Sequence, residues 1–290
     1  GTTNSCVSIW RNGKLEIITD EFGNKTIPSI VTLTDTKMVG IEAKNNFHRK
    51  NTFYNIKRLI GQTYDNKIVQ HNLKLSTFDH CDNNNSILLK CNNKTYNPEE
   101  ISAMILSKLK LLASKYLNTN ITKAIITIPA YFNDAQRQAT KDAAKIAGLQ
   151  VIRLLNEPTA AAIAYGLSLQ KDIEKNVIIF DLGGGTLDVS LLNMQDGIFQ
   201  VKAISGNCNL GGCDFDQRLV NYCLYQFCKD NMVDYNKIDN IVKLNKACEQ
   251  CKRILTNNEK HTIIINNFYN NITLNIEISR DKFNELCNDL

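Results

Sequence analysis

The stretch Asp181-Leu182-Gly183-Gly184-Gly185-Thr186-Leu187-Asp188 decides the fold class of this chain. It follows an apolar run at residues 177–180 that is typical of a strand, so a carboxylate stands at a strand end before three residues without side chains. Consecutive glycines let backbone N–H groups approach an anion closely, as in a phosphate-binding nest. An ordinary tight hairpin needs one or two glycines, so the segment favours a phosphate site.

An internal repeat extends this pattern to the start of the chain. Residues 1–9 resemble residues 183–191, which lie 182 positions further on. In each copy a turn of small residues leads into a strand, a hairpin signal (Asn12-Gly13 or Asp196-Gly197) and a second strand. The repeat predicts two lobes of like topology, each with a tight polar loop. The match is short, and chance similarity is the alternative.

Strand and helix signals alternate through the middle of the chain, which indicates an α/β architecture. We expect buried strands at 122–128 and 151–155 and helices at 98–116, 135–147, 159–165 and 241–255. Asn97 and Asn133 are predicted N-caps, and Gly148 and Gly166 end the helices before them.

Composition excludes several classes of protein. The chain has 290 residues, of which 43% are hydrophobic and 22% charged, and no apolar run is long enough for a membrane helix. Its net charge of +5 is spread without a basic stripe, so we expect no nucleic-acid and no membrane partner. A cytoplasmic location is predicted, with an organellar matrix as the alternative. No P-loop or dinucleotide fingerprint occurs.

Ten cysteines in a chain of this length, without a secretory signal, favour free thiols over a disulfide framework. Cys248 and Cys251 have the spacing of a zinc-binding pair. They lie in a strongly helical stretch without a matching histidine pair, so core positions are the preferred interpretation.

Several longer stretches resemble the seventy-kilodalton heat-shock (DnaK-type) chaperones, and they occur in order over the whole chain. These stretches are Gly1-Thr2-Thr3-Asn4-Ser5-Cys6, Ile56-Lys57-Arg58-Leu59-Ile60-Gly61, Ile128-Pro129-Ala130-Tyr131-Phe132-Asn133-Asp134, residues 136–143, residues 156–162, residues 181–190, and Leu210-Gly211-Gly212 followed by Asp214-Phe215-Asp216.

The resemblance implies an actin-like ATPase fold with two lobes around a nucleotide cleft. Residues 1–168 would form lobe I, and residues 169–290 would form lobe II, incomplete at its C-terminal end. It also implies hydrolysis of MgATP to ADP and phosphate, which in these chaperones controls the binding of client peptides by a downstream domain.

The resemblance also assigns the site residues. The phosphate-binding residues would be Gly1, Thr2, Thr3 and Asn4 on one side, and Gly183, Gly184, Gly185 and Thr186 on the other, with Gly211 and Gly212 in a further nucleotide loop. Lys57 matches the lysine that contacts the γ-phosphate and the attacking water, and Thr186 would help to stabilise charge. Glu157 and Asp181 match carboxylates that hold magnesium through its waters. By themselves, Lys57 could be a solvated lysine and Glu157 a helix-start carboxylate.

Four residues of the 241–255 region share a helix face through i, i+3, i+4 and i+7 spacing. They are Glu249, Lys252, Arg253 and Thr256. In the family this face meets ribose and adenine, with the arginine plane available to stack on the base. An exposed charged face is the alternative. The chain differs from the family pattern at Leu187, Cys213 and Thr256, and the change at Cys213 puts local loop contacts in doubt.

The implied partners are unfolded client polypeptides, a J-domain co-chaperone at Arg153 and a nucleotide-exchange factor. Pro129 and Arg137 match positions tied to coupling between ATP and client. The family has a strand with a magnesium-side carboxylate before Gly1 and a second Gly-Gly loop after Leu290, so we expect a weakly active or inactive fragment with residues 177–180 partly uncovered. Sugar or acetate kinases and a non-catalytic or filament-forming member are the alternatives, although no residues of an acceptor pocket stand out.

Overall fold

The computed structural model of the chain describes residues 1–166, 174–195, 198–234, 238 and 240–290. Its elements form two compact units, Gly1–Asn209 and Leu210–Leu290. The predicted lobe boundary at 168/169 lies outside the described residues and stays a prediction.

The first unit holds most of the sheets and five α-helices among its described residues. Its elements are β1 (Asn4–Ser5), β2 (Val7–Arg11), β3 (Lys14–Ile18), β4 (Ile27–Pro28), β5 (Val31–Leu33), β6 (Lys37–Val39), α1 (Ile41–Asn45), β7 (Thr52–Phe53), the 3-10 helix η1 (Ile56–Arg58), α2 (Lys67–Leu75), β8 (Asp79–Asn83), β9 (Ser86–Cys91), β10 (Lys94–Tyr96), α3 (Pro98–Leu117), β11 (Lys123–Ile128), α4 (Asp134–Ile146), β12 (Gln150–Asn156), α5 (Glu157–Gly166), β13 (Lys175–Leu182), β14 (Leu187–Gln195) and β15 (Ile198–Asn207). The second unit consists of α6 (Gly212–Asn231), α7 (Ile241–Ile254), β16 (Lys260–Tyr269), β17 (Ile272–Ser279) and α8 (Arg280–Cys287).

The predicted helices begin and end where their capping residues stand. In α3 the backbone N–H of Asn97 donates to Glu100 Oε2 at 2.8 Å, which is half of a capping box. In α4 the Oδ1 of Asn133 accepts the Gln136 N–H at 2.9 Å, and Gly148, with φ of 69°, follows the helix end. Local chemistry therefore confirms both helix predictions.

The strands β11 and β12 pair in parallel as a two-stranded sheet, in agreement with the predicted strand–helix–strand order. One face packs on α4, where Leu154 contacts the cluster that contains Ile128 and Ala143. Ile125 of β11 is 60% exposed, and Ile152, which has no register partner between Val151 and Arg153, is 63% exposed. The prediction that 151–155 is a buried strand was wrong, because the irregular register breaks the alternation and leaves Ile152 and Arg153 exposed in succession.

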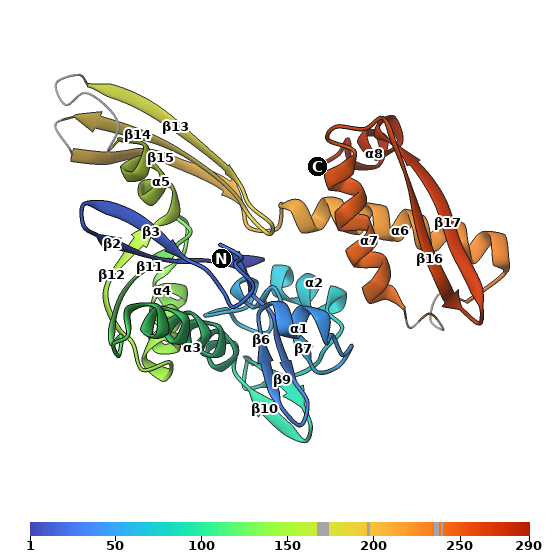
Figure 1. Ribbon diagram of the computed structural model, residues 1–290, viewed down its shortest axis with the longest axis horizontal. Helices are drawn as coiled ribbons and strands as arrows, with labels where there is room; N and C mark the ends of the chain where they lie inside the picture. Colours follow the sequence, from blue (N-terminus) through green and yellow to red (C-terminus); the bar gives the residue numbers. More distant parts are fainter. Residues whose placement is uncertain (167–173, 196–197, 235–237, 239) are drawn as a thin grey trace. The chain divides into compact units, whose positions relative to one another are not determined.

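The glycine-rich stretch connects β13 to β14 in an antiparallel sheet of order β13-β14-β15 (Figure 1). Helix α5 covers one face, where Ala162 packs with Leu192 and Met194. On the other face Ile178 and Phe180 are exposed. The strand alternates between a face under α5 and an uncovered face, so it is not buried throughout.

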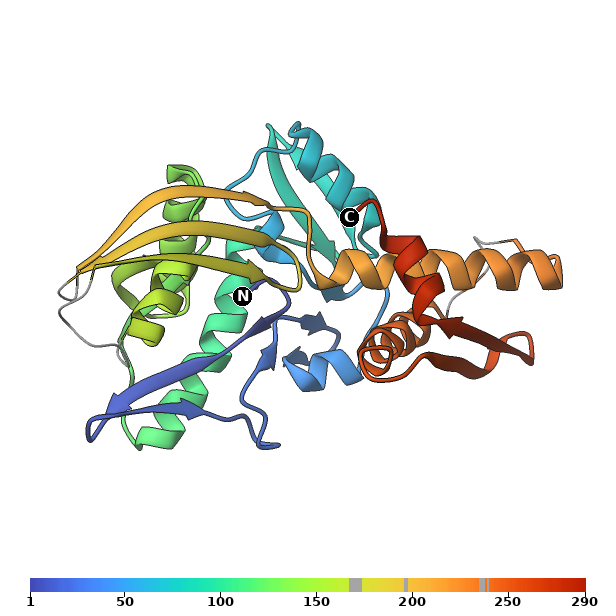
Figure 2. The ribbon, with the colours of Figure 1, turned by 90° about the horizontal axis from the view of Figure 1, so that it is seen from above.

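The first copy of the repeat is a hairpin of β2 and β3 beside helix α3 (Figure 2). Its turn has left-handed Asn12 and Gly13, and Ile18 packs against Leu112 and Ala113 of the helix. The second copy pairs β14 with β15 antiparallel, which confirms the predicted strands. Its turn signal, Asp196-Gly197, lies outside the described residues.

In the second unit α6 and α7 pack with the hairpin β16–β17 around one core. Cys223, Cys248 and Cys251 are fully buried in it, and burial raises the pKa of the Cys251 thiol to about 12. All ten cysteines are free thiols, so Cys248 and Cys251 act as small apolar core residues.

Asparagine supplies most of the left-handed turns. Among the described non-glycine residues with positive φ, ten of eleven are asparagines, at positions 12, 55, 84, 85, 92, 93, 118, 267, 270 and 271. Asparagine tolerates this conformation because its short amide can bond to the local backbone. The exception is Met232, directly after α6.

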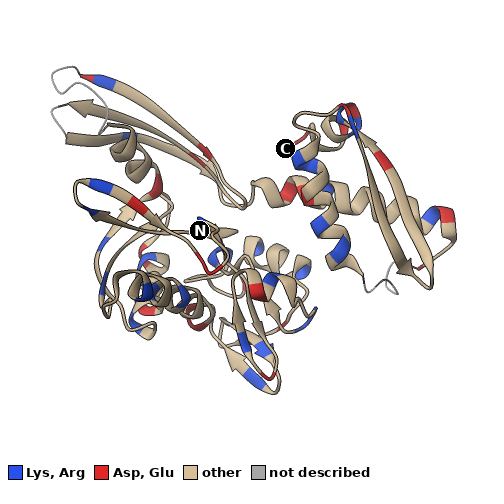
Figure 3. Ribbon diagram, viewed as in Figure 1, with Lys and Arg blue, Asp and Glu red and all other residues tan. Residues whose placement is uncertain are grey.

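Charged residues of both signs are interspersed along the elements of each unit (Figure 3). Within the described residues, no helix is both long and apolar enough to cross a bilayer.

Candidate active site

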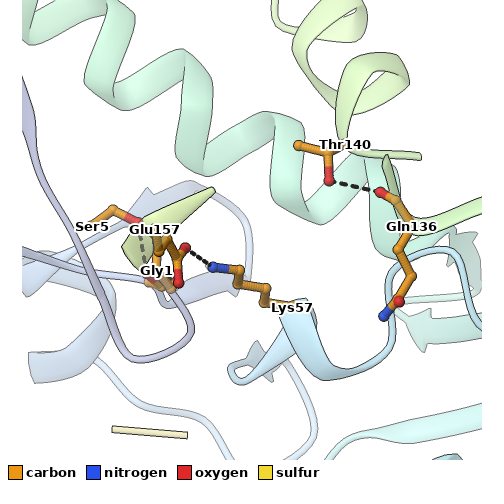
Figure 4. Close-up of polar contacts among 7 residues, drawn as sticks. Gly1, Ser5, Lys57, Gln136, Thr140 and Glu157 are labelled. Carbon is orange, nitrogen blue, oxygen red and sulfur yellow. Dashed lines mark hydrogen bonds and ion pairs between the residues drawn. The ribbon is translucent and has the colours of Figure 1, made fainter. Parts of the chain in front are cut away.

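Lys57 and Glu157 form an ion pair at the centre of the candidate site (Figure 4). Lys57 lies on η1, which the buried side chain of Ile56 anchors, and Glu157 is the first residue of α5. Their side chains are 17% and 20% exposed, so solvent screens the pair only in part. Glu157 therefore interacts with both a helix N-terminus and Lys57, and the two interpretations of it are compatible.

The two glycine-containing loops of the repeat are in direct contact beside this pair. A Cβ atom added to Gly184 would lie 2.1 Å from Thr3 Oγ1, and one added to Gly185 would lie 2.5 Å from Thr2 Cγ2. None of Gly183, Gly184 and Gly185 has positive φ, so close approach is what requires glycine here. The structure thus brings together the two predicted phosphate loops.

Ser29, which the sequence did not single out, fixes the first loop. Its backbone N–H donates to Thr3 O at 2.8 Å, and its hydroxyl donates to Gly1 O at 2.9 Å. Asn4 continues the loop as the first residue of β1, opposite Pro28 of β4.

Two carboxylates lie opposite each other in the β13–β14 hairpin, close to its turn. Asp181 and Asp188 are register partners, and burial, followed by repulsion from Glu157, raises the pKa of each. Asp188 Oδ1 is buried and accepts no well-formed hydrogen bond among the described residues, although the Thr186 hydroxyl is near enough to lower the pKa of Asp188 in part. Asp188 was not among the predicted site residues, because a strand aspartate within a motif carries no separate signal.

This excess of carboxylates fits a bound magnesium ion. The Glu157 carboxylate raises the cost of ionising Asp181 and Asp188, which a cation would relieve. Within the described residues, no group of three or more His, Cys, Asp or Glu side chains is arranged as a complete metal site. Magnesium usually keeps several waters and takes its other ligands from phosphates, so such a site does not need a protein cage.

Arg58 is a further residue that sequence reasoning did not assign to the site. It follows Lys57 on η1 and donates to the carbonyl of Gly185 from Nη2 at 2.6 Å and from Nε at 3.1 Å. Adjacent residues of one 3-10 turn therefore hold two parts of the site, Glu157 and the glycine loop.

The second unit contains the remaining predicted residues. Lys252 bonds to Asp216 Oδ1 at 2.7 Å and to Gly212 O at 2.8 Å, so it joins α7 to the start of α6. Glu249 and Arg253 form an i,i+4 pair at 2.6 Å in which the Arg253 side chain is 71% exposed. Gly211 donates its N–H to Asp214 Oδ2 at 2.8 Å. Thr256 lies just beyond the end of α7, so the helix does not carry all four residues of the predicted face.

Arg153 lines a cavity of about 450 Å³ between α4 and β12 in the first unit. Its other lining residues are Asp134, Arg137, Gln138, Lys141, Val151, Ile152 and Leu154. Arg137 also donates to Phe132 O at 2.9 Å and to Asn156 Oδ1 at 3.3 Å, and Asn156 directly precedes Glu157.

Comparison with known proteins identifies the family. The family model described as Hsp70 protein matches residues 1–290. Heat shock 70 kDa protein 2 of Paracoccidioides lutzii and heat shock 70 kDa protein of Neurospora crassa are each 46% identical over the whole chain, which covers 46% of each relative. Heat shock protein 70 homolog of Acanthamoeba polyphaga mimivirus is 43% identical, and the chain covers 33% of it.

The chain therefore belongs to the Hsp70 family, and the prediction of an actin-like α/β fold is confirmed. It spans about half the length of the first relatives it matches.

Proposed function

We propose that this chain is the ATP-binding and ATP-hydrolysing part of an Hsp70 chaperone. One observation carries the proposal: the Thr2–Thr3 loop packs against Gly184 and Gly185 directly beside the Lys57–Glu157 pair. Two loops with closely spaced backbone N–H groups and a lysine match the needs of a triphosphate. Membership of the Hsp70 family supports the assignment.

The proposed reaction is in-line attack of water on the γ-phosphorus, with cleavage of the bond to the bridging oxygen of ADP. Little covalent chemistry is left to the protein, so its residues act by positioning and by charge. Lys57 would neutralise charge on the γ-phosphate, and Glu157 would hold the ammonium group in place. The Thr186 hydroxyl and the loop amides would contact the phosphate oxygens.

Magnesium would bind through waters held by Glu157 and Asp181, and it would supply charge neutralisation on the β- and γ-phosphates. Asp188, with its buried Oδ1 atom, is a third carboxylate available to hydrated cations. On α7 the exposed Arg253 guanidinium is available to stack on a base.

The proposed partners follow from the family. ATP turnover would control the binding of unfolded polypeptides by a further part of the chaperone, and an exchange factor would release ADP. Arg153, in the cavity between α4 and β12, is the proposed J-domain contact. Arg137 lines the same cavity and bonds to Phe132 and to Asn156, the residue before Glu157.

Substitution of Gly184 tests the proposal. Gly184→Ala places a Cβ against Thr3, so the two loops must move apart. Because both loops would contact the phosphates, we expect the binding free energy of ATP and of ADP to become less favourable by about 1–3 kcal/mol. Calorimetric titration of the complete natural protein with each nucleotide measures this loss, and Arg11→Ala on the exposed hairpin is the control. Unchanged affinity in Gly184→Ala would contradict the two-loop site. Tight binding without any hydrolysis by the unsubstituted protein would favour a non-catalytic member of the family.

A further inference from the structure

The side chain of Arg58 contacts the glycine loop through its backbone. Two of its nitrogen atoms donate to a single acceptor, the carbonyl oxygen of Gly185, at 2.6 and 3.1 Å. A Cβ at Gly185 would also lie 3.4 Å from Arg58 Nε, so the guanidinium lies against this residue. Two converging hydrogen bonds define the direction of a carbonyl better than one does.

The direction of that carbonyl determines the direction of the next amide. Peptide bonds are planar, and the described part of the chain contains no cis bond. In a trans peptide unit the N–H points opposite to the C=O, so a Gly185 carbonyl held by Arg58 directs the Thr186 N–H away from Arg58. Glycines on the N-terminal side of this unit offer little resistance to rotation, because they have no Cβ to restrict the backbone.

The hydrogen bond that closes the loop does not set this orientation. The Gly183 N–H donates to Thr186 O at 2.9 Å, which closes the turn between β13 and β14 but does not involve the Gly185–Thr186 peptide unit. A Cβ added to Gly184 would meet Thr3 and one added to Gly185 would meet Thr2, so these contacts limit the spacing of the two loops.

We propose that Arg58 is a positioning residue that orients the Gly185–Thr186 peptide unit so that the Thr186 amide faces the nucleotide phosphates. This inference rests on the proposed function, since it needs phosphates in the loop. Lys57 acts on the same site from the preceding residue, so one 3-10 turn would align both a charged donor and a backbone donor. An amide aligned before the reaction stabilises developing charge without the cost of reorganisation.

The test compares Arg58→Ala, Arg58→Lys and the control Arg11→Ala in the complete natural protein. For Arg58→Ala we expect single-turnover hydrolysis to fall by about tenfold to a hundredfold, with ATP and ADP affinities within about threefold of the unsubstituted protein. Millimolar guanidinium ion should restore part of the rate, and methylammonium should not, because only the planar ion can donate twice to one carbonyl.

Arg58→Lys keeps the charge and guards against a folding defect in the alanine variant. It should have the melting temperature of the unsubstituted protein and hydrolyse ATP several-fold more slowly, because an ammonium group does not reproduce the two hydrogen bonds that the guanidinium donates to the Gly185 carbonyl. An unchanged rate in Arg58→Ala, or the full rate in a folded Arg58→Lys, would overturn the proposal. So would a loss of ATP affinity with ADP affinity intact, which indicates direct contact with the γ-phosphate.

Failure of this inference is distinguishable from failure of the proposed function. If the unsubstituted protein hydrolyses ATP and Lys57→Ala slows it while Arg58→Ala does not, only the role of Arg58 is wrong. If the unsubstituted protein neither binds nor hydrolyses ATP, the proposed function itself is wrong.

Discussion

Glu157 interacts with more parts of the candidate site than its position in the sequence indicates. It pairs with Lys57, stands at the first position of α5 and raises the pKa of both Asp181 and Asp188. A glutamine at this position would keep the shape and one hydrogen bond to Lys57, but it would remove the negative charge.

We expect Glu157→Gln to lower ATP turnover by about tenfold or more and to raise the magnesium concentration needed for half-maximal rate, because a neutral amide holds hydrated magnesium weakly. Titration of the hydrolysis rate with magnesium measures both effects. Glu277→Gln removes one partner of the exposed Lys260 pair in the second unit and is the control. If Glu157→Gln had the same rate and magnesium requirement as the control, Glu157 would have no part in the mechanism.

The cysteines permit a second prediction at the residue scale. Cys6 is exposed, whereas Cys251 is fully buried with a pKa of about 12. At pH 8 only about one Cys251 in ten thousand would be a thiolate, so native-state alkylation should label Cys6 first and leave Cys251 unmodified. Mass spectrometry of the labelled peptides at pH 8 and pH 9 measures this order. Early labelling of Cys251 would contradict the packing of α6 against α7.

At the scale of elements, helix ends offer a matched pair of substitutions. Met232 has φ of 52° after α6 and is 96% exposed, so its side chain gains little from its position. Met232→Gly should raise the free energy of unfolding by about 0.5–1 kcal/mol, because glycine adopts this conformation without strain.

Gly148 after α4 is the reverse case, since a Cβ there would lie 2.9 Å from Lys110 Nζ at φ of 69°. Gly148→Ala should lower the free energy of unfolding by about 1 kcal/mol or more. Urea denaturation measures both changes. A lower free energy of unfolding for Met232→Gly, or an unchanged or higher one for Gly148→Ala, would refute the assigned cap geometry.

Elements with local signals could be predicted from the sequence, and contacts between distant residues could not. Asn97, Asn133 and Gly148 place the ends of α3 and α4, because capping depends on neighbours three or four residues away. Ile152 is exposed where the register of β11 and β12 is irregular, and the periodicity of one segment contains no information about the register of two strands.

The same limit applies to the candidate site. The approach of Lys57 to Glu157 spans 100 positions, and that of Arg58 to Gly185 spans 127. Lys57 and Glu157 were each expected at the site only because they lie in family motifs, and their ion pair was not predicted. The acceptor of the second contact is a backbone carbonyl, which every residue type has, so the sequence does not indicate it.

On the scale of the whole molecule, the cavity between α4 and β12 contains Arg153, the proposed J-domain contact. Arg153→Ala should lower the stimulation of hydrolysis by a J-domain protein while leaving the basal rate within about twofold, because Arg153 lies in the cavity and outside the Lys57–Glu157 pair. Hydrolysis assays with and without the J-domain protein measure the ratio, and Arg11→Ala is the control. Equal loss of basal and stimulated rates would argue against a partner contact.

The most direct test of the proposed nucleotide site is single-turnover hydrolysis by Lys57→Ala, measured beside ATP affinity in the complete natural protein. Lys57 would act on charge that develops during the reaction, while the loops and magnesium would supply most of the ground-state binding. We predict that ATP affinity stays within about tenfold and that the hydrolysis rate falls by about a hundredfold or more. An unchanged hydrolysis rate in Lys57→Ala would contradict the account.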